Sequence, residues 1–407
     1  MTIVDLEAET PTPNTVTFEA WDSQREALVA DNVLLKSGLN PSTDFEPEYI
    51  AVSGGKAYVT LQENNAIAVL DLASGQFTGI HSLGFKDHSQ PGNELDANKE
   101  DQQANLQTEN FLGVYMPDGI TLYEVDGKTY LLTANEGDAS EWEEYANITT
   151  VVTGTVENDG ETTDVEVEVL DKTKLDGLPA VAEDTNFLLG GRSFSLYEVT
   201  ENGLTQVFDS GSDFERITAQ AYPDHFNASN KNNKLDSRSD AKGPEPESVT
   251  VNLVDGKPYA YVGLERIGGV MVYDLSDPTH PTFVEYVNTR DFTVDFPEEG
   301  TDPAQGDVSV EGMCVVPAAV SPTGQALLLT ANEVSGTVAV FQHSQQAETP
   351  AELPFTDVTQ GDWYYDAVAY AYENGLMDGV GGNRFAPNSA TTRGMLVTIL
   401  YRLEGEP

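Results

Sequence analysis

Cysteine and basic residues are scarce in this sequence, which excludes a disulfide within the chain and argues against nucleic-acid binding. Among 407 residues there is one cysteine, Cys314, so no disulfide can form within the chain. Lysine and arginine together number 20 against 68 acidic residues, which gives a formal net charge of −48. Because nucleic-acid binding needs basic surface to displace counterions, this balance argues against a nucleic-acid partner. The acidity fits solubility, divalent-cation binding, or a wall surface rich in cations and salt.

Long apolar runs are lacking as well. No stretch of about 20 apolar residues occurs, so we expect no transmembrane helix. The opening MTIVDLEAETPTP has neither the basic nor the apolar region of a signal peptide. We therefore expect either a protein that stays inside the cell or a chain whose true N-terminus is missing.

What the sequence does contain is a repeat. Four segments, starting at Glu46, Met116, Glu245 and Val310, each read as an acid, a β-branched run, a Gly-containing turn, a second apolar run and another acid. Small residues and a third run follow in three of the four, and a long insertion follows the second acid in the segment from Met116. Several antiparallel strands per unit of roughly 40–50 residues are typical of β-propeller blades, whereas a β-sandwich would not echo unit by unit. We predict a mainly β chain with four propeller blades and tight turns at four dipeptides: Gly54-Gly55, Asp126-Gly127, Asp255-Gly256 and Thr323-Gly324.

The first residues predict a fifth, partial blade. TIVDL at 2–6 matches AVLDL at 68–72 and MVYDL at 271–275, each the third strand of its unit. We therefore expect the chain to begin inside a blade, with earlier blades missing and an open edge near residues 1–10.

Two acids recur at fixed places in each unit, one before the first strand and one after the second. In an up-and-down blade these two loops lie at the same end, so all the acids should lie on one face. Gathered carboxylates repel one another but suit hard cations, Ca²⁺ first and Mg²⁺ or Mn²⁺ behind it. The alternative is that the acids cap turns within each blade. The predicted metal ligands are Glu48 with Glu63, Asp118 with Glu136, Glu247 with Glu265, and Glu311 with Glu333.

Two long insertions carry further polar residues, and a third reads as a polar hairpin over 149–170. Loops over a propeller face commonly hold ligands, and arginines are scarce in this acidic chain. An arginine there fits a phosphate or carboxylate ligand, or a structural ion pair. The alternative for the loops as a whole is that they are solvated surface. The candidate ligand-binding residues are His88, Arg192, Arg238 and Asp240. No catalytic triad, phosphate-binding loop or zinc-type spacing stands out.

Residues 1–343 resemble the choice-of-anchor I domain of bacterial surface proteins, which is similar to a mesenchyme-specific cell-surface glycoprotein. The resemblance rests on EPEYIAV, KDHSQPGNELDA, LLTANEGDASEW, GGRSFSLYE, SRSDAKGPEPESVTV and GLERIGGVMVYDLSDPTHPTF. It implies a propeller in which several blades precede EPEYIAV. Members are often labelled alkaline phosphatase-like, but the resemblance fixes no chemistry.

After a linker at 344–353, residues 354–407 resemble an S-layer homology (SLH) module. The ordered motifs are FTDV, WYYDAV, GLMDG, FAP and TR. We expect helices over 363–374 and 392–403 that pack on each other. The resemblance implies binding of secondary cell-wall polysaccharide, with Trp363 and Arg393 at the family's positions. The acid usual two places after Arg393 is Met395 here, and such modules generally occur in threes.

Together these features predict an extracellular, wall-anchored protein of a Gram-positive-type bacterium, its signal peptide lost with the missing N-terminus. The first hypothesis is a surface binding module that binds divalent cations and an unknown ligand. The second is a metal-dependent phosphoesterase in which Glu48, Glu247 and Glu311 hold metal and Arg238 faces phosphate. The third is a structural spacer.

Overall fold

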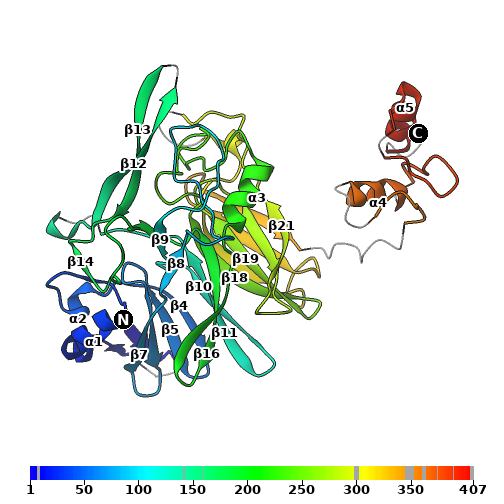
Figure 1. Ribbon diagram of the computed structural model, residues 1–407. Helices are drawn as coiled ribbons and strands as arrows, with labels where there is room; N and C mark the ends of the chain where they lie inside the picture. The colour runs from blue at the N-terminus through cyan, green and yellow to red at the C-terminus, as the bar shows by residue number, and fades with distance from the viewer. Residues whose placement is uncertain are drawn as a thin grey trace. The chain divides into compact units, whose positions relative to one another are not determined.

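The computed structural model describes residues 1–6, 10–140, 143–158, 160–297, 302–343, 353–359, 364–373, 375–387 and 389–403 (Figure 1). The chain divides into two compact units, Met1–His343 and Ser344–Pro407. Strands dominate the first unit and two helices the second, as the sequence predicts. Among the described residues, no helix is both long enough and apolar enough to cross a membrane.

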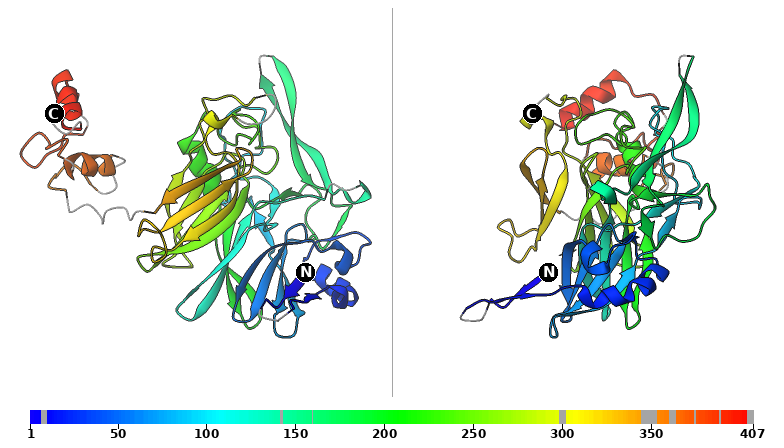
Figure 2. Two further views of the ribbon diagram at one scale, coloured as in Figure 1. Left: turned by 180° about the vertical axis from the view of Figure 1, so that it is seen from behind. Right: turned by 90° about the vertical axis from the view of Figure 1, so that its left-hand side faces the viewer.

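Four antiparallel sheets, one per sequence repeat, form most of the first unit. In each sheet the strands pair in chain order, and the sheets follow one another from blue to yellow in Figure 2. The first sheet contains β4 (Pro47–Ser53), β5 (Lys56–Leu61), β6 (Ala66–Asp71) and β7 (Gln76–Ser82). The second contains β10 (Ile120–Val125), β11 (Lys128–Asn135), β16 (Ser193–Thr200) and β17 (Gly203–Asp209). The third contains β18 (Pro246–Val254), β19 (Lys257–Leu264), β20 (Val270–Asp274) and β21 (Thr282–Val287). The fourth contains β22 (Val310–Val316), β23 (Leu327–Asn332) and β24 (Thr337–Gln342).

The sheets are neighbours through their first strands. Strand β4 contacts β10, β10 contacts β18, and β18 contacts β22. The described residues contain no sheet that closes on itself, so the mainly β class is established and a propeller ring stays a prediction.

Three of the four predicted turns are confirmed. The dipeptides Gly54-Gly55, Asp126-Gly127 and Asp255-Gly256 each join two paired strands, and all six residues have positive φ. Positive φ at both central residues defines the mirror-image hairpin turn that matches strand twist. The fourth dipeptide, Thr323-Gly324, also lies between paired strands, where Gly324 N donates to Ser321 O at 3.1 Å, but the loop that joins β22 to β23 is longer than a two-residue turn.

A long insertion interrupts the second sheet between β11 and β16. It contains the predicted polar hairpin, which is confirmed as β12 (Ile148–Asn158) and β13 (Glu161–Leu170). The hairpin extends away from the four sheets in Figures 1 and 2. The insertion continues through β14 (Leu175–Asp176), paired with β3 (Leu35–Lys36), to β15 (Asn186–Leu189). Strand β15 runs parallel to β9 (Phe111–Val114), which pairs with β8 (Phe85–Asp87).

The remaining elements of the first unit are short. At the start, β1 (Thr2–Val4) pairs with β2 (Pro13–Thr15), and the two lie outside the four sheets. The helical elements are η1 (Glu19–Gln24), α1 (Arg25–Ala30), α2 (Pro41–Asp44), η2 (Glu143–Tyr145), α3 (Asp213–Ala221) and η3 (Pro303–Gln305).

Layers of buried apolar side chains lie between successive sheets. One contains Tyr58, Ile67 and Leu131, from the first and second sheets. The largest contains Leu132, Phe194, Val262 and Tyr273, from the second and third. A third contains Tyr261, Val272 and Leu328, from the third and fourth. The hydrophobic effect therefore holds the sheets face to face.

The second unit contains the two predicted helices, α4 (Tyr365–Glu373) and α5 (Arg393–Leu403). Its core is Phe355, Val358, Val368 and Phe385, with the Asp357 carboxylate accepting backbone hydrogen bonds from Phe385 (2.8 Å) and Ala386 (3.0 Å). The predicted packing of α4 on α5 involves Trp363 and Ala367, whose side chains lie outside the described residues, so it stays a prediction. Phe355 and Phe385 from the flanking loops pack with Val368 of α4. Leu396, Val397, Leu400 and Tyr401 of α5 are half to two-thirds exposed.

Gly190 allows close backbone contact where the insertion rejoins the second sheet. Gly190 has φ +79°, and a Cβ there would lie 2.0 Å from the backbone oxygen of Glu136. We expect Gly190→Ala to destabilise the chain by about 3 kcal/mol or more, because backbone strain adds to this clash. Gly127→Ala is the matched control, with φ +75° and nothing within 4 Å of its Cβ. This control should lose about 1 kcal/mol of unfolding free energy. Urea denaturation measures both, and equal losses would contradict the role given to the close contact.

Candidate functional site

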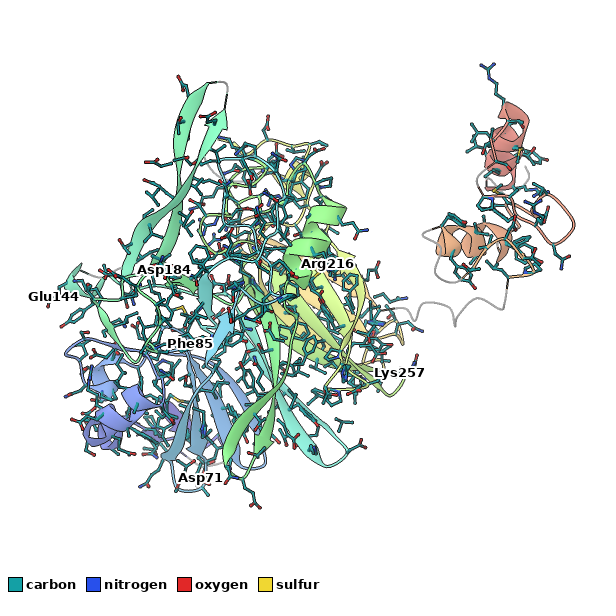
Figure 3. All side chains as sticks on the ribbon, in the orientation of Figure 1. Asp71, Phe85, Glu144, Asp184, Arg216 and Lys257 are labelled. Carbon is teal, nitrogen blue, oxygen red and sulfur yellow. The ribbon has the colours of Figure 1, made fainter. Side chains whose placement is uncertain are left out.

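An acidic cavity of about 320 Å³ lies at one end of the four sheets. The first strands begin at this end and the second strands end there. Figure 3 labels Asp71 and Lys257 near the opposite end, where the hairpin turns lie. Seven acids and two cations line the cavity, together with Tyr49 and Gln62. The charged residues are Glu48, Asp118, Glu136, Asp138, Glu247, Glu265, Glu311, Lys242 and Arg266.

Six of the eight acids predicted as metal ligands line this cavity. The two that do not, Glu63 and Glu333, come from the first and last sheets. Glu63 is half-buried, and its neighbour Gln62 lines the cavity instead. Glu333 is exposed, and its backbone amide donates to Ser309.

β-bulges place the first acid of three sheets. The strand register shifts between Pro47 and Ile50, between Pro246 and Ser248, and between Val310 and Gly312. Glu247 and Glu311 are the extra residues at two of these shifts, and Glu48 lies with Tyr49 at the third. A bulge leaves its extra residue out of the ladder and redirects its side chain, which explains why one acid from each strand start faces the cavity.

Three carboxylates converge at the centre of the cavity. One oxygen each from Asp118, Glu136 and Glu247 lies within 4.8 Å of the other two. Asp118 is 5% exposed, and its Oδ2 is buried without a hydrogen-bond donor among the described residues. In a second trio, Glu136, Glu245 and Glu265, one carboxylate oxygen of each residue also lies within 4.8 Å of the other two.

Cations that the sequence analysis missed occupy the second trio. Lys242 Nζ lies 2.6 Å from Glu136 Oε1 and 2.9 Å from Glu245 Oε2. Arg266 lies 2.8 Å from Glu245 Oε2 through Nε and 2.9 Å from Glu265 Oε1 through Nη1. Gln62 Nε2 donates to the other oxygen of Glu136 at 2.8 Å. The available signals were a lysine three residues before Glu245 and an arginine next to Glu265, in a chain with few of either.

The two trios therefore differ in electrostatics. Burial raises the pKa of Glu245, but Lys242, Arg238 and Arg266 outweigh burial and lower this pKa to about 2. The pKa values of Asp118 and Glu247 are raised, first by burial and then by neighbouring carboxylates. Burial also raises the pKa of Glu136, despite Lys242, and that of Glu265 to about 7. Without another cation, the front of the cavity therefore holds protons near neutral pH.

The predicted ligand-binding residues lie outside this cavity. Arg192 is buried and donates to Glu215 Oε1 (2.8 Å) and to the backbone oxygens of Asp96, Ser239 and Ala241. Arg238 donates to Glu245 Oε1 at 2.7 and 3.0 Å. Both placements favour the structural ion pair over a contact with phosphate or carboxylate ligands.

The other two candidates are also engaged within the fold. Asp240 is paired with Lys99 Nζ at 2.5 Å. His88 is 1% exposed, with Nδ1 2.7 Å from the Asn93 oxygen, and burial lowers its pKa to about 3. A buried, neutral imidazole is typical of a core residue.

Of the two wall-binding candidates, Trp363 lies outside the described residues. Arg393 is the first residue of α5 and is exposed.

The raised pKa values predict how stability depends on pH. Glu265 binds its proton up to about pH 7 in the folded chain but only to about pH 4.5 when unfolded. The folded state then holds more protons between these values, so stability falls as pH rises through the window. Without divalent cations, we expect a loss of about 1–3 kcal/mol from pH 5 to 8. Glu265→Gln should flatten this slope in chemical denaturation. A chain that gains stability from pH 5 to 8 would contradict the assignment.

Comparisons with known proteins place this chain in a family. The family model described as the choice-of-anchor I domain matches residues 1–278, and that of the S-layer homology domain matches residues 354–394. The first match ends before β22, although the repeat continues to β24.

Three relatives are similar over part of their length. Gigasin-3a of Magallana gigas is 31% identical over 178 residues, which is 42% of this chain and 62% of gigasin-3a. The mesenchyme-specific cell surface glycoprotein of Strongylocentrotus purpuratus is 28% identical over 231 residues, or 46% of this chain and 29% of that protein. The surface-layer 125 kDa protein of Lysinibacillus sphaericus is 40% identical over 70 residues, or 16% of this chain and 6% of that protein. The chain thus spans less than two-thirds of each relative.

A solved structure of a functionally unknown protein from Desulfotomaculum acetoxidans is 11% identical. The alignment covers 84% of this chain and 75% of that chain, with a TM-score of 0.30, which supports no conclusion. The two family matches carry more weight, because one spans most of the chain and the pairing with an S-layer homology domain indicates a protein anchored at the cell surface. The chain belongs to the choice-of-anchor I domain family and carries an S-layer homology domain near its C-terminal end.

Proposed function

We propose that this chain is a surface binding module of a Gram-positive-type bacterium, attached to secondary cell-wall polysaccharide through its S-layer homology domain. Its choice-of-anchor I domain is a β-propeller that binds a divalent cation, Ca²⁺ before Mg²⁺ or Mn²⁺, in the acidic cavity. The observation that carries this proposal is the convergence of the carboxylates of Asp118, Glu136 and Glu247, with a buried Asp118 oxygen that has no donor among the described residues.

The arrangement of the sheets supports the propeller. Each sheet shares an apolar layer with the next, and their first strands are neighbours in chain order. In a propeller the first strand of each blade lines the central channel. Acids at the starts of these strands then face one common space.

The ligand chemistry supports a hard cation. All three residues offer carboxylate oxygens, and these lie within 4.8 Å of one another, so one ion can contact all three. Ca²⁺ accepts irregular sets of six to eight oxygens, whereas Mg²⁺ demands near-ideal octahedral geometry, so Ca²⁺ is the first candidate.

The hydrogen bonds weigh against turn capping as the role of these acids. Among the described residues, no backbone amide donates to the carboxylates of Glu48, Asp118, Glu247 or Glu311. Lys242 and Arg266 form ion pairs with Glu136, Glu245 and Glu265, whereas Asp118 and Glu247 form none among the described residues. A divalent cation there would relieve the mutual repulsion of the carboxylates.

Asp118→Asn tests the cation site. We expect Ca²⁺ to raise the melting temperature of the unaltered chain, with about 2.7 kcal/mol of stabilisation when free ion exceeds the Kd 100-fold. Asp118→Asn should abolish most of that shift, because it replaces the oxygen that has no donor. Glu333→Gln removes the same charge outside the cavity and should leave the shift unchanged. If the melting temperature does not shift at millimolar Ca²⁺, Mg²⁺ or Mn²⁺, the cation site is contradicted and turn capping is the favoured role of the acids.

Sedimentation with purified cell walls tests the anchor. The chain should bind walls weakly through its one S-layer homology domain, and deletion of residues 344–407 should abolish binding. Arg393→Ala should weaken binding several-fold, because an exposed arginine can form charge-assisted bonds with anionic wall polymer. Arg216→Ala, which removes an exposed arginine from the first unit, is the matched control. Unchanged sedimentation of both the deletion and Arg393→Ala would contradict the anchoring role.

A further inference from the structure

The ammonium group of Lys242 lies within the second trio of carboxylates, which is formed by Glu136, Glu245 and Glu265. Its Nζ lies 2.6 Å from Glu136 Oε1, 2.9 Å from Glu245 Oε2 and 2.7 Å from the backbone oxygen of Gly137. An ammonium has three N–H donors, so these three oxygens match its bonding capacity. The Lys242 side chain is 13% exposed, and that of Glu245 is fully buried. Carboxylate and backbone carbonyl oxygens are also the ligands that Ca²⁺ binds.

Hydrogen bonds hold the backbone on each side of Lys242. The Ala241 oxygen accepts from Arg192 Nη2 at 2.8 Å, and the Gly243 amide donates to the Arg238 oxygen at 3.0 Å. These bonds fix the point from which the lysine side chain enters the cavity. The ammonium is therefore positioned by the fold of the insertion and not by its carboxylate partners alone.

Glu136 belongs to both trios, because its carboxylate also converges with those of Asp118 and Glu247. Two groups of oxygens that share one carboxylate offer positions for two cations side by side. Lys242 fills one of these positions. Burial lowers the pKa of Lys242, but Glu245 and Glu136 outweigh burial and raise this pKa above its ordinary value. The ammonium is therefore charged at neutral pH.

We propose that Lys242 is a specificity-determining residue, which makes the acidic cavity a site for one divalent cation instead of two. Its tethered ammonium takes the position of a second ion between Glu136 and Glu245. Adjacent positive charges repel, so a second divalent cation is excluded while the ammonium stays there. This inference rests on the proposed cation at Asp118. It favours a surface binding module over a phosphoesterase that clamps phosphate between two ions.

Calcium per chain, measured by atomic emission after chelation and equilibrium dialysis against millimolar Ca²⁺, tests the proposal. Lys242→Met removes the ammonium and leaves three oxygens that Ca²⁺ can bind, so this variant should bind one equivalent more than the unaltered chain. Lys242→Arg restores a cation and should bind the same number as the unaltered chain. Lys99→Met is the matched control, because Lys99 pairs with Asp240 outside the cavity, and its removal should not change the number.

The folding of Lys242→Met supplies a second measurement. Without its lysine, the buried pair of Glu136 and Glu245 loses a counter-charge, so the variant should be less stable than the unaltered chain in chelator. Millimolar Ca²⁺ should restore its melting temperature, because the second ion replaces the ammonium. A variant that stays unfolded at millimolar Ca²⁺, as circular dichroism would show, would overturn the proposal, since no ion would then take the place of the ammonium.

The outcomes separate this inference from the cation site itself. If Asp118→Asn loses one equivalent while folded Lys242→Met gains none, the cation site stands and the role of Lys242 is overturned. If Lys242→Met gains one equivalent while Asp118→Asn loses none, the cation at Asp118 fails and the exclusion of an ion by Lys242 stands. Equal gains in Lys99→Met and Lys242→Met would also overturn the role of Lys242, because they would report net charge alone.

Discussion

Repulsion among carboxylates is the interaction on which the account of this protein depends. Seven acids face one cavity of about 320 Å³, and two cations line it with them. Buried like charges ionise together only where opposite charge is supplied. Lys242, Arg238 and Arg266 supply enough of it only to Glu245, whose pKa they lower to about 2. The pKa values of Asp118, Glu136, Glu247 and Glu265 stay raised, so these acids hold protons unless a cation binds.

The fold produces this arrangement through irregularities repeated from sheet to sheet. Bulges at Glu48, Glu247 and Glu311 turn one acid of each first strand toward the same space. The close contact between Gly190 and the backbone of Glu136 holds the central carboxylate at the edge of the second sheet. The apolar layers between sheets supply the stability that offsets the cost of gathering charge.

The repeated features of both fold and site were predictable from sequence. Alternating runs, Gly-containing turns and recurring acids indicated the sheets, three of the four turns and six of the seven acids that line the cavity. A repeated sequence pattern gives a repeated geometry at the start of each first strand. Asp118 and Glu247 were therefore expected at equivalent positions before their contacts were known.

The rest depends on the paths of insertions, which no period in the sequence encodes. Lys242 reaches Glu136 across 106 residues, so its sequence position gave no indication of its partner. For Arg192 the sequence left open a ligand contact or a structural ion pair, and the residue pairs with Glu215 and joins two loops from inside.

Direct location of the ion tests the central claim best. Crystals grown with Ca²⁺, or with Tb³⁺ in its place, should show an anomalous scattering peak in the acidic cavity. The account predicts that peak about 2.3–2.6 Å from oxygens of Asp118 and Glu247. Crystals from millimolar Ca²⁺ that show no peak there, with the carboxylates bonded to each other through shared protons, would contradict it.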